Sequence, residues 1–284
     1  MSVHVLTATR VDGWNLEQLT ALPRGPAQPV DVLFVHGICT GARIFAERFL
    51  DAFAAAGFRA HALSLRGHGG SDGRDWLKTF TLADYVADLR AALAAIGRPT
   101  VVVGFSMGGA VLQAHLRAGG RPAGAVLLAS VPPWGLGPST LRLMVEDPAL
   151  FHQLWLLSGV GVAAVEPAVM RRALFTDAID DDGFRTFLAD AHDESPLVGL
   201  ELLGGRPIAP WPLGLPPVAV VGGALDRLVP ADDVRATAAW YRVRPVILEG
   251  LAHAMMLEPE WPRAAAPILD FCGRIAASRS ERAA

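Results

Sequence analysis

The chain has 284 residues, of which 52% are hydrophobic and 19% are charged, and its formal net charge is −3. This composition excludes a disordered chain, gives no electrostatic case for nucleic acid or an anionic membrane surface, and suits one α/β domain with an insertion. The two cysteines, Cys39 and Cys272, argue against a disulfide framework. Because no leader pattern opens the chain and no apolar segment reaches membrane-spanning length, we expect a cytoplasmic protein without a membrane span.

The first half of the chain alternates predicted strands with predicted helices. An Asp12-Gly13 pair between the first two strands is typical of a hairpin turn. The strands are short apolar runs, predicted at residues 3–10, 14–22, 30–35, 59–65, 100–103 and 123–128. The helices have apolar residues at helical spacing, and they are predicted at residues 43–56, 82–96 and 109–116.

The alternation lapses after the sixth predicted strand. Four helical patterns fill the gap, at residues 141–145, 150–157, 167–174 and 182–191. We interpret residues 131–212 as an inserted helical cap, or lid, and residues 1–130 and 213–284 as the core domain.

Alternation then resumes, with strands predicted at residues 218–222 and 245–248, helices at 232–241 and 262–276, and a polar tail that we expect to fray. Strands that alternate with helices predict an α/β fold with a parallel sheet and helices on both faces. Ligands bind such sheets at the carboxyl ends of the strands, so the loops that follow the strands are expected to converge on one edge.

One of these loops carries a nucleophile motif. Residues 104–108 read Gly-Phe-Ser-Met-Gly, which fits G-x-S-x-G between a predicted strand and a predicted helix. Glycines at the flanks allow a tight turn that strains the serine backbone and presents its hydroxyl at the N-terminal end of the helix. We predict that Ser106 is a catalytic nucleophile; the alternative is a glycine-rich packing turn.

A serine hydroxyl needs a base, and the base needs an orienting acid. Of the eight histidines, His253 follows the last predicted strand and is predicted as the base; the alternative is a solvated loop histidine. Asp226 is the first carboxylate after the strand at 218–222 and is predicted as the acid, against a surface turn aspartate. The order Ser106, Asp226, His253 is the one expected for a nucleophile elbow on this kind of sheet.

The oxyanion of the reaction needs two donors. We predict the backbone N–H groups of Met107, which follows the nucleophile, and of Ile38 in the glycine-rich loop after the strand at 30–35. His36 in that loop is expected to bond the loop backbone. Cys39 has no better-placed base than Ser106 has, so it is expected at most to line the edge of the pocket.

Five segments carry a resemblance to the α/β-hydrolase superfamily: Val32-Leu33-Phe34-Val35-His36-Gly37, Arg66-Gly67-His68-Gly69-Gly70-Ser71, Gly104-Phe105-Ser106-Met107-Gly108-Gly109, Asp226-Arg227-Leu228-Val229-Pro230 and Gly250-Leu251-Ala252-His253. The resemblance spans residues 30–276 apart from the cap. It implies an eight-stranded, mostly parallel sheet with a lid after the sixth strand. Within the superfamily the chain looks most like cap-bearing esterases and monoacylglycerol-lipase-like or lysophospholipase-like serine hydrolases.

Two positions refine the resemblance. Ser64 stands where relatives often carry aspartate, in a loop that is structural in most members. Serine rather than aspartate at position 106 argues against haloalkane dehalogenases and epoxide hydrolases, which resemble this chain elsewhere.

The expected activity is hydrolysis of a carboxylic ester with a hydrophobic acyl group through an acyl-enzyme. Apolar residues of the cap should form its own core and in part the pocket, so Trp134 and Trp155, with Cys39 and Met255, are expected at the substrate. No metal-ligand spacing or phosphate-binding glycine pattern is present, so no metal and no cofactor are expected, and the partner is a small ester. The alternatives are perhydrolysis, carbon–carbon bond hydrolysis or acyl transfer by the same triad, and a non-catalytic ligand receptor.

Overall fold

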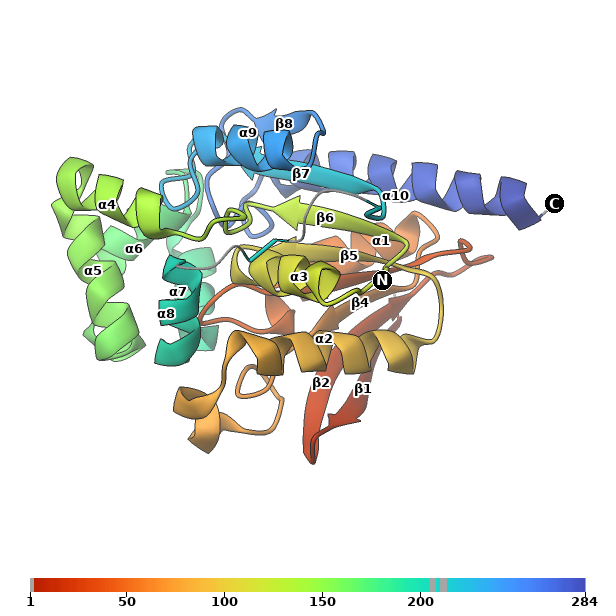
Figure 1. The fold of residues 1–284 in the computed structure, drawn as a ribbon, viewed down its shortest axis with the longest axis horizontal. Helices are drawn as coiled ribbons and strands as arrows, with labels where there is room; N and C mark the ends of the chain where they lie inside the picture. The colour runs from red at the N-terminus through yellow and green to blue at the C-terminus, as the bar shows by residue number, and fades with distance from the viewer. Residues whose placement is uncertain (1–2, 205–207, 210–213, 284) are drawn as a thin grey trace.

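The computed structural model describes residues 3–204, 208–209 and 214–283. Its centre is an eight-stranded sheet with the strand order β1-β2-β4-β3-β5-β6-β7-β8 (Figure 1). The strands are β1 (Val3–Val11), β2 (Trp14–Leu22), β3 (Asp31–Val35), β4 (Ala60–Leu63), β5 (Thr100–Phe105), β6 (Gly124–Leu128), β7 (Val218–Gly223) and β8 (Pro245–Leu248). The pairs β1–β2 and β2–β4 are antiparallel, and β3 to β8 pair in parallel. The predicted α/β fold with a mostly parallel, eight-stranded sheet is confirmed.

Helices cover both faces of the sheet and explain why its central strands are apolar along their whole length. Every residue of β3, β4, β5 and β6 is buried. On one face, the buried layer that includes Val32 and Phe34 is covered by helices such as α1 (Asp51–Ala55) and α10 (Trp261–Ala283). On the other face, the layer that includes Leu33 and Val35 is covered by α2 (Leu82–Ile96), α3 (Met107–Arg117) and α9 (Ala231–Trp240). The alternation of side chains along each strand thus divides the core into two layers.

Two predicted helices differ from the structure. The segment predicted as one helix at 43–56 begins as a 3₁₀ turn at Ala42–Phe45, continues as a π-helix at Ala46–Leu50 and ends as α1. The predicted fraying after residue 276 is wrong, since α10 continues to Ala283. Two short 3₁₀ helices complete the described part of the chain, η3 (Arg74–Thr79) and η4 (Val162–Ala164).

Among the described residues, five α-helices lie between β6 and β7 and gather beyond the carboxyl ends of the strands, at the left of Figure 1. They are α4 (Gly137–Glu146), α5 (Pro148–Gly159), α6 (Pro167–Leu174), α7 (Asp181–Asp190) and α8 (Pro196–Leu203). We propose that they form the cap. Its predicted end, at residues 212–213, lies outside the described residues.

One cap helix, α8, is not among the helices predicted from the sequence. Its start signal is present, since Ser195 accepts a hydrogen bond from the Val198 N–H and Pro196 occupies the first turn.

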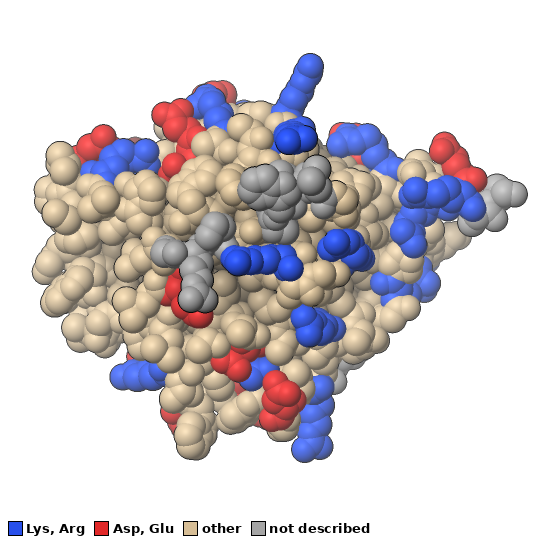
Figure 2. Space-filling model, viewed as in Figure 1, with Lys and Arg blue, Asp and Glu red and all other residues tan. Residues whose placement is uncertain are grey.

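The face of the cap in Figure 2 carries few charges, and most of the exposed large apolar side chains of the described residues belong to the cap.

Candidate active site

The turn that carries Ser106 is as tight as its glycines suggest. β5 ends at Phe105 and α3 begins at Met107, and Ser106 between them has φ 51° and ψ −114°. A Cβ at Gly104 would lie 2.4 Å from the Gly108 carbonyl oxygen, and one at Gly108 would lie 2.3 Å from the Val35 carbonyl oxygen. Only glycine fits these positions, so the packing forces the strained backbone that lifts the serine out of the sheet.

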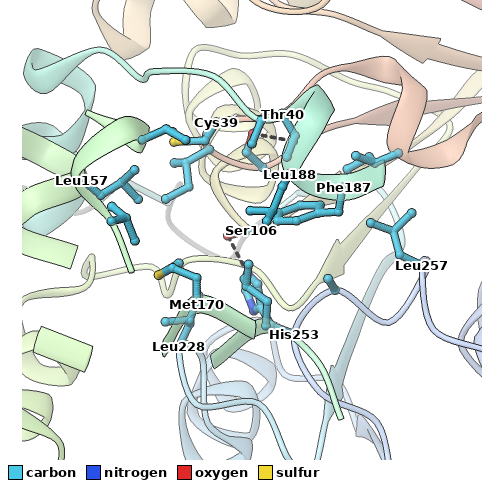
Figure 3. Close-up of a pocket in the computed structure, with 18 of the residues that line it drawn as sticks. Cys39, Thr40, Ser106, Leu157, Met170, Phe187, Leu188, Leu228, His253 and Leu257 are labelled. Atoms are coloured by element: carbon cyan, nitrogen blue, oxygen red, sulfur yellow. Dashed lines mark hydrogen bonds between the residues drawn. The ribbon is translucent and has the colours of Figure 1, made fainter. Parts of the chain in front are cut away.

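The three residues predicted as a triad meet at the carboxyl edge of the sheet. The His253 Nε2 atom lies 3.1 Å from the Ser106 Oγ atom (Figure 3). The His253 Nδ1 atom lies 2.7 Å from an oxygen of Asp226. All three residues are at most 9% exposed. Because Asp226 accepts a hydrogen bond from the Nδ1–H group of His253, the Nε2 atom carries no proton and can accept the hydroxyl proton of Ser106.

Asp226 is fixed from its other side. Its second oxygen accepts hydrogen bonds of 2.8 Å from the N–H groups of Leu228 and Val229, in the loop that follows β7. His253 lies in the loop that follows β8, and its ring packs against Phe105 with 5.0 Å between the ring centroids. Both side chains therefore have neighbours that hold their orientation.

The loop after β3 passes directly over the serine turn. A Cβ at Gly37 would lie 3.1 Å from the Ser106 Cβ atom, so the backbone that leads into Ile38 borders the nucleophile. Ile38 lines the same pocket as Ser106, and Met107 follows Ser106 as the first residue of α3. The N–H groups of Ile38 and Met107 remain the predicted oxyanion donors.

His36 bonds the backbone of its loop, as expected. Its Nδ1 atom donates to the Gly37 carbonyl at 2.8 Å, and its Nε2 atom accepts from the Leu65 N–H at 3.0 Å. Burial, reinforced by the nearby charge of His68, lowers the pKa of His36 to about 3. The ring is therefore neutral at physiological pH, and its two hydrogen bonds link the loops that follow β3 and β4.

An apolar pocket of about 120 Å³ opens beside the triad (Figure 3). Cys39 lines it, as expected, together with Ser106 and His253. Most of the remaining lining side chains are apolar residues that sequence analysis did not assign to the substrate, among them Ile44, Leu154, Leu157, Val162, Val165, Met170, Leu174, Phe187, Leu188, Leu228, Met256 and Leu257.

Three residues expected at the substrate lie elsewhere. Trp155 faces away from the pocket, since its side chain is 60% exposed and stacks with His152. Met255 is fully buried in the core, and its neighbour Met256 reaches the pocket instead. Trp134 belongs to the connection before α4 and does not line the pocket. The expectation that these three contact the substrate is wrong for the pocket beside Ser106.

Neither a metal site nor a membrane span is present in the described part of the chain. No group of three or more His, Cys, Asp or Glu side chains among these residues could hold a metal ion. Within the same residues, no helix has the length and apolar character that crossing a bilayer requires.

Comparisons with known proteins bear on the fold and the family of the chain. A candidate aryl esterase from Burkholderia cenocepacia is similar with a TM-score of 0.72 and 25% identity, over 97% of this chain and 100% of that one. A bromoperoxidase from Bacillus anthracis (TM-score 0.74, 17% identity, 95% and 100% covered) and an esterase from Exiguobacterium antarcticum (0.73, 16%, 95% and 99%) share the fold. None of the curated proteins compared with the chain matches it. The sequence model of the alpha/beta hydrolase family matches residues 32–265, and the chain therefore belongs to that family.

Proposed function

We propose that the chain is a serine hydrolase that cleaves a carboxylic ester with a hydrophobic acyl group. The observation that carries this proposal is the unbroken line of hydrogen bonds from Asp226 through His253 to Ser106. A serine hydroxyl is a weak nucleophile, and a buried histidine oriented by a carboxylate is the arrangement that activates it. Membership of the alpha/beta hydrolase family supports the same class of reaction.

In the proposed mechanism, the Ser106 oxygen attacks the ester carbonyl carbon while the His253 Nε2 atom takes the hydroxyl proton. Asp226 stabilises the resulting imidazolium, and the N–H groups of Ile38 and Met107 hold the negatively charged oxygen of the tetrahedral intermediate. The proton passes from His253 to the leaving alcohol, and an acyl-enzyme remains on Ser106. A water molecule, deprotonated by His253, then attacks the acyl carbon and releases the carboxylic acid.

The pocket supports a hydrophobic acyl group as the part of the substrate that is recognised. Its lining beyond the triad is almost entirely aliphatic and aromatic. A cavity needs roughly 10–15 Å³ of such space to hold a single water molecule. The pocket of about 120 Å³ therefore suits an acyl chain of medium length.

Cys39 borders the pocket but is not proposed as a nucleophile. Burial raises the pKa of its thiol, and the charges of Glu194 and Asp193 raise it further. Since the thiolate is the reactive form of cysteine, this thiol is inert at neutral pH.

Labelling and kinetics together test the proposal. We expect a fluorophosphonate probe to label the wild-type protein, and p-nitrophenyl esters of graded chain length to be hydrolysed with a medium-chain optimum. Ser106→Ala should lose both labelling and activity, whereas Ser158→Ala, at an exposed cap serine, should behave as the wild type. An unlabelled wild-type protein, or full esterase activity in Ser106→Ala, would contradict the proposal.

Product analysis separates the other reactions of the same triad. Perhydrolysis, carbon–carbon bond hydrolysis and acyl transfer would give a peracid, two fragments of a diketone, or a new ester, respectively. A non-catalytic receptor would bind the ester without any labelling of Ser106.

A further inference from the structure

A buried carboxylate of the cap reaches the loop that carries Ile38. Glu194 lies between α7 and α8, and its side chain is only 8% exposed. One carboxylate oxygen accepts from the His68 Nε2 atom at 3.0 Å and from the Cys39 N–H at 3.3 Å. The other accepts from the Tyr85 hydroxyl at 2.7 Å and from the Ser195 N–H at 2.8 Å. Four donors from the core and the cap thus converge on one side chain.

The contacts of His68 indicate that this site holds an ion pair. Its Nδ1 atom lies 2.9 Å from the Arg66 carbonyl oxygen, which can only accept, and its Nε2 atom faces the carboxylate of Glu194. A ring with acceptors at both nitrogens carries both protons. Burial by itself raises the pKa of Glu194, but the charge of His68 and the hydrogen bonds outweigh it and lower that pKa to about 2.

The cap holds both backbone polar groups of Cys39. Its N–H donates to Glu194, and its carbonyl oxygen accepts from the His192 N–H at 3.0 Å. Cys39 has φ 60°, a left-handed conformation that is unfavourable for residues other than glycine and needs support from its neighbours. The Cys39 N–H lies in the peptide plane that joins Ile38 to Cys39, so the bond to Glu194 fixes the plane on the C-terminal side of Ile38 and thereby restrains the residue that carries the predicted oxyanion donor.

We propose that Glu194 is a positioning residue for the oxyanion hole: by holding the Cys39 N–H, the cap keeps the Ile38 N–H directed at the substrate oxygen. The inference rests on the proposed ester hydrolysis. It makes the rate of the chemical step depend on a cap residue that does not line the pocket. If Glu194 instead only anchored the cap to the core, its effect would depend on the ion pair with His68.

Two conservative variants separate these roles. Glu194→Asp keeps a negative charge near His68 but draws back the oxygen that His68 and Cys39 share, so that the longer of the two contacts, with the Cys39 N–H at 3.3 Å, is lost. Glu194→Gln keeps the length and an acceptor oxygen but loses the charge. Alanine is avoided because it would leave His68, a buried charge, without a partner.

Glu201 supplies the matched control. It is an exposed cap carboxylate that also bonds the core, since it accepts from the Leu82 N–H at 2.7 Å, but it does not contact the loop of Cys39. The variants Glu201→Asp and Glu201→Gln therefore loosen a cap contact without touching the proposed oxyanion hole.

We expect kcat to fall when the side chain at position 194 is shortened, and to stay near the wild-type value when only its charge is removed. Glu194→Asp should lower kcat roughly 10- to 100-fold, below the loss of about 10²–10³ seen when a whole oxyanion donor is removed. KM should change by less than about threefold, because an interaction made only in the transition state is affected. Glu194→Gln and both Glu201 variants should stay near the wild-type kcat.

A pair of inhibitors checks that the oxyanion hole is what changes. The Ser106 oxygen adds to the carbonyl carbon of a trifluoromethyl ketone that carries the preferred acyl chain, and an oxyanion forms. The matching methyl ketone binds mainly through its chain. Glu194→Asp should weaken the trifluoromethyl ketone by the same factor as kcat and leave the methyl ketone unchanged.

Other outcomes overturn the inference. A larger loss of kcat in Glu194→Gln than in Glu194→Asp would assign the effect to the ion pair, and equal losses in Glu201→Asp would assign it to general cap anchoring. Equal weakening of both ketones would also contradict it. A wild-type protein without esterase activity or probe labelling would instead refute the proposed function.

Discussion

Ser106 keeps its strained backbone because the turn around it leaves no space for relaxation. The neighbouring glycines touch the backbone of β3, of α3 and of the loop after β6 at distances that no side chain permits. The strain is thus maintained by packing over the whole turn rather than by one contact.

Gly108 is the residue at which this packing can be tested. A methyl group there would lie 2.3 Å from the Val35 carbonyl oxygen and 2.6 Å from that of His36. We expect Gly108→Ala to lower the free energy of unfolding by about 1–3 kcal/mol and to reduce activity, because α3 must move away from the oxyanion loop. Urea unfolding and ester hydrolysis measure both effects. Gly273 is the control, because a methyl group there meets no other atom; in Gly273→Ala the free energy of unfolding should rise by up to about 1 kcal/mol. If Gly108→Ala had the stability and activity of the wild type, the tight contact would be contradicted.

Asp226 should matter through the tautomer of His253. An asparagine at 226 can keep its oxygen toward the N–H groups of Leu228 and Val229, and it then presents an NH₂ group to the His253 Nδ1 atom. His253 would carry its proton on Nε2 and could not accept one from Ser106. We expect Asp226→Asn to lower kcat by roughly 10⁴, by analogy with other triads. Asp232→Asn, at the exposed start of α9, is the control, and a loss below tenfold at Asp226 would argue against its proposed role.

At the scale of the elements, the sequence predicts the core elements and four of the cap helices, but it does not predict which cap side chains face the pocket. Core strands are recognised as short apolar runs and core helices by apolar residues at helical spacing. By contrast, α5 has apolar residues on all sides. Its periodicity therefore does not predict that Leu154 and Leu157 line the pocket while Trp155 faces solvent. Met255 and Met256 lie in a turn, where no period applies, and the wrong one of the two was expected at the substrate.

Leu157 on α5 gives the pocket a testable length limit. Its side chain lines the cavity together with Met170 of α6 (Figure 3). Leu157→Phe should fill the cavity and lower kcat/KM for longer esters about tenfold relative to short ones. A change of this size lies in the range of discrimination that one methylene group gives in a hydrophobic pocket. Leu157→Ala should shift the optimum toward longer chains. The matched control is Trp155→Ala, which should leave the chain-length profile unchanged; a shifted profile there would place Trp155 at the substrate after all.

At the scale of the whole molecule, the parallel sheet brings distant segments together at one edge. Ser106, Asp226 and His253 follow three different strands, and the rule that loops converge at the carboxyl ends was enough to predict their meeting. Glu194 has no such signal, because it follows a cap helix rather than a strand and belongs to no motif. Its contact with Cys39 could be found only from the packing of the cap on the core.

Three groups around His68, namely His36, His192 and Glu194, have folded-state pKa values below their ordinary ones, which makes the stability of the fold sensitive to acid. Burial and the charge of His68 lower the pKa of His36 to about 3 and that of His192 to about 4. The pKa of Glu194 is about 2, because the charge of His68 and several hydrogen bonds outweigh burial. In each case the unfolded chain binds a proton at a higher pH than the folded one does. Their contribution to stability is therefore complete above the unfolded pKa and is lost as pH falls through the folded pKa.

His36 should dominate the first part of this loss. Its unfolded pKa is near 6.5 and its folded pKa is about 3, so between pH 7 and pH 4 the wild type should lose on the order of 3 kcal/mol through this residue. His36→Gln can still donate and accept within the loop but cannot take up a proton. It should therefore show a flatter dependence of the free energy of unfolding on pH, measured by urea titration at pH 7, 5.5 and 4. His152→Gln, at an exposed cap histidine, should keep the wild-type slope, and an unchanged slope in His36→Gln would mean that the buried ring at position 36 takes up its proton as readily in the folded protein as in the unfolded chain.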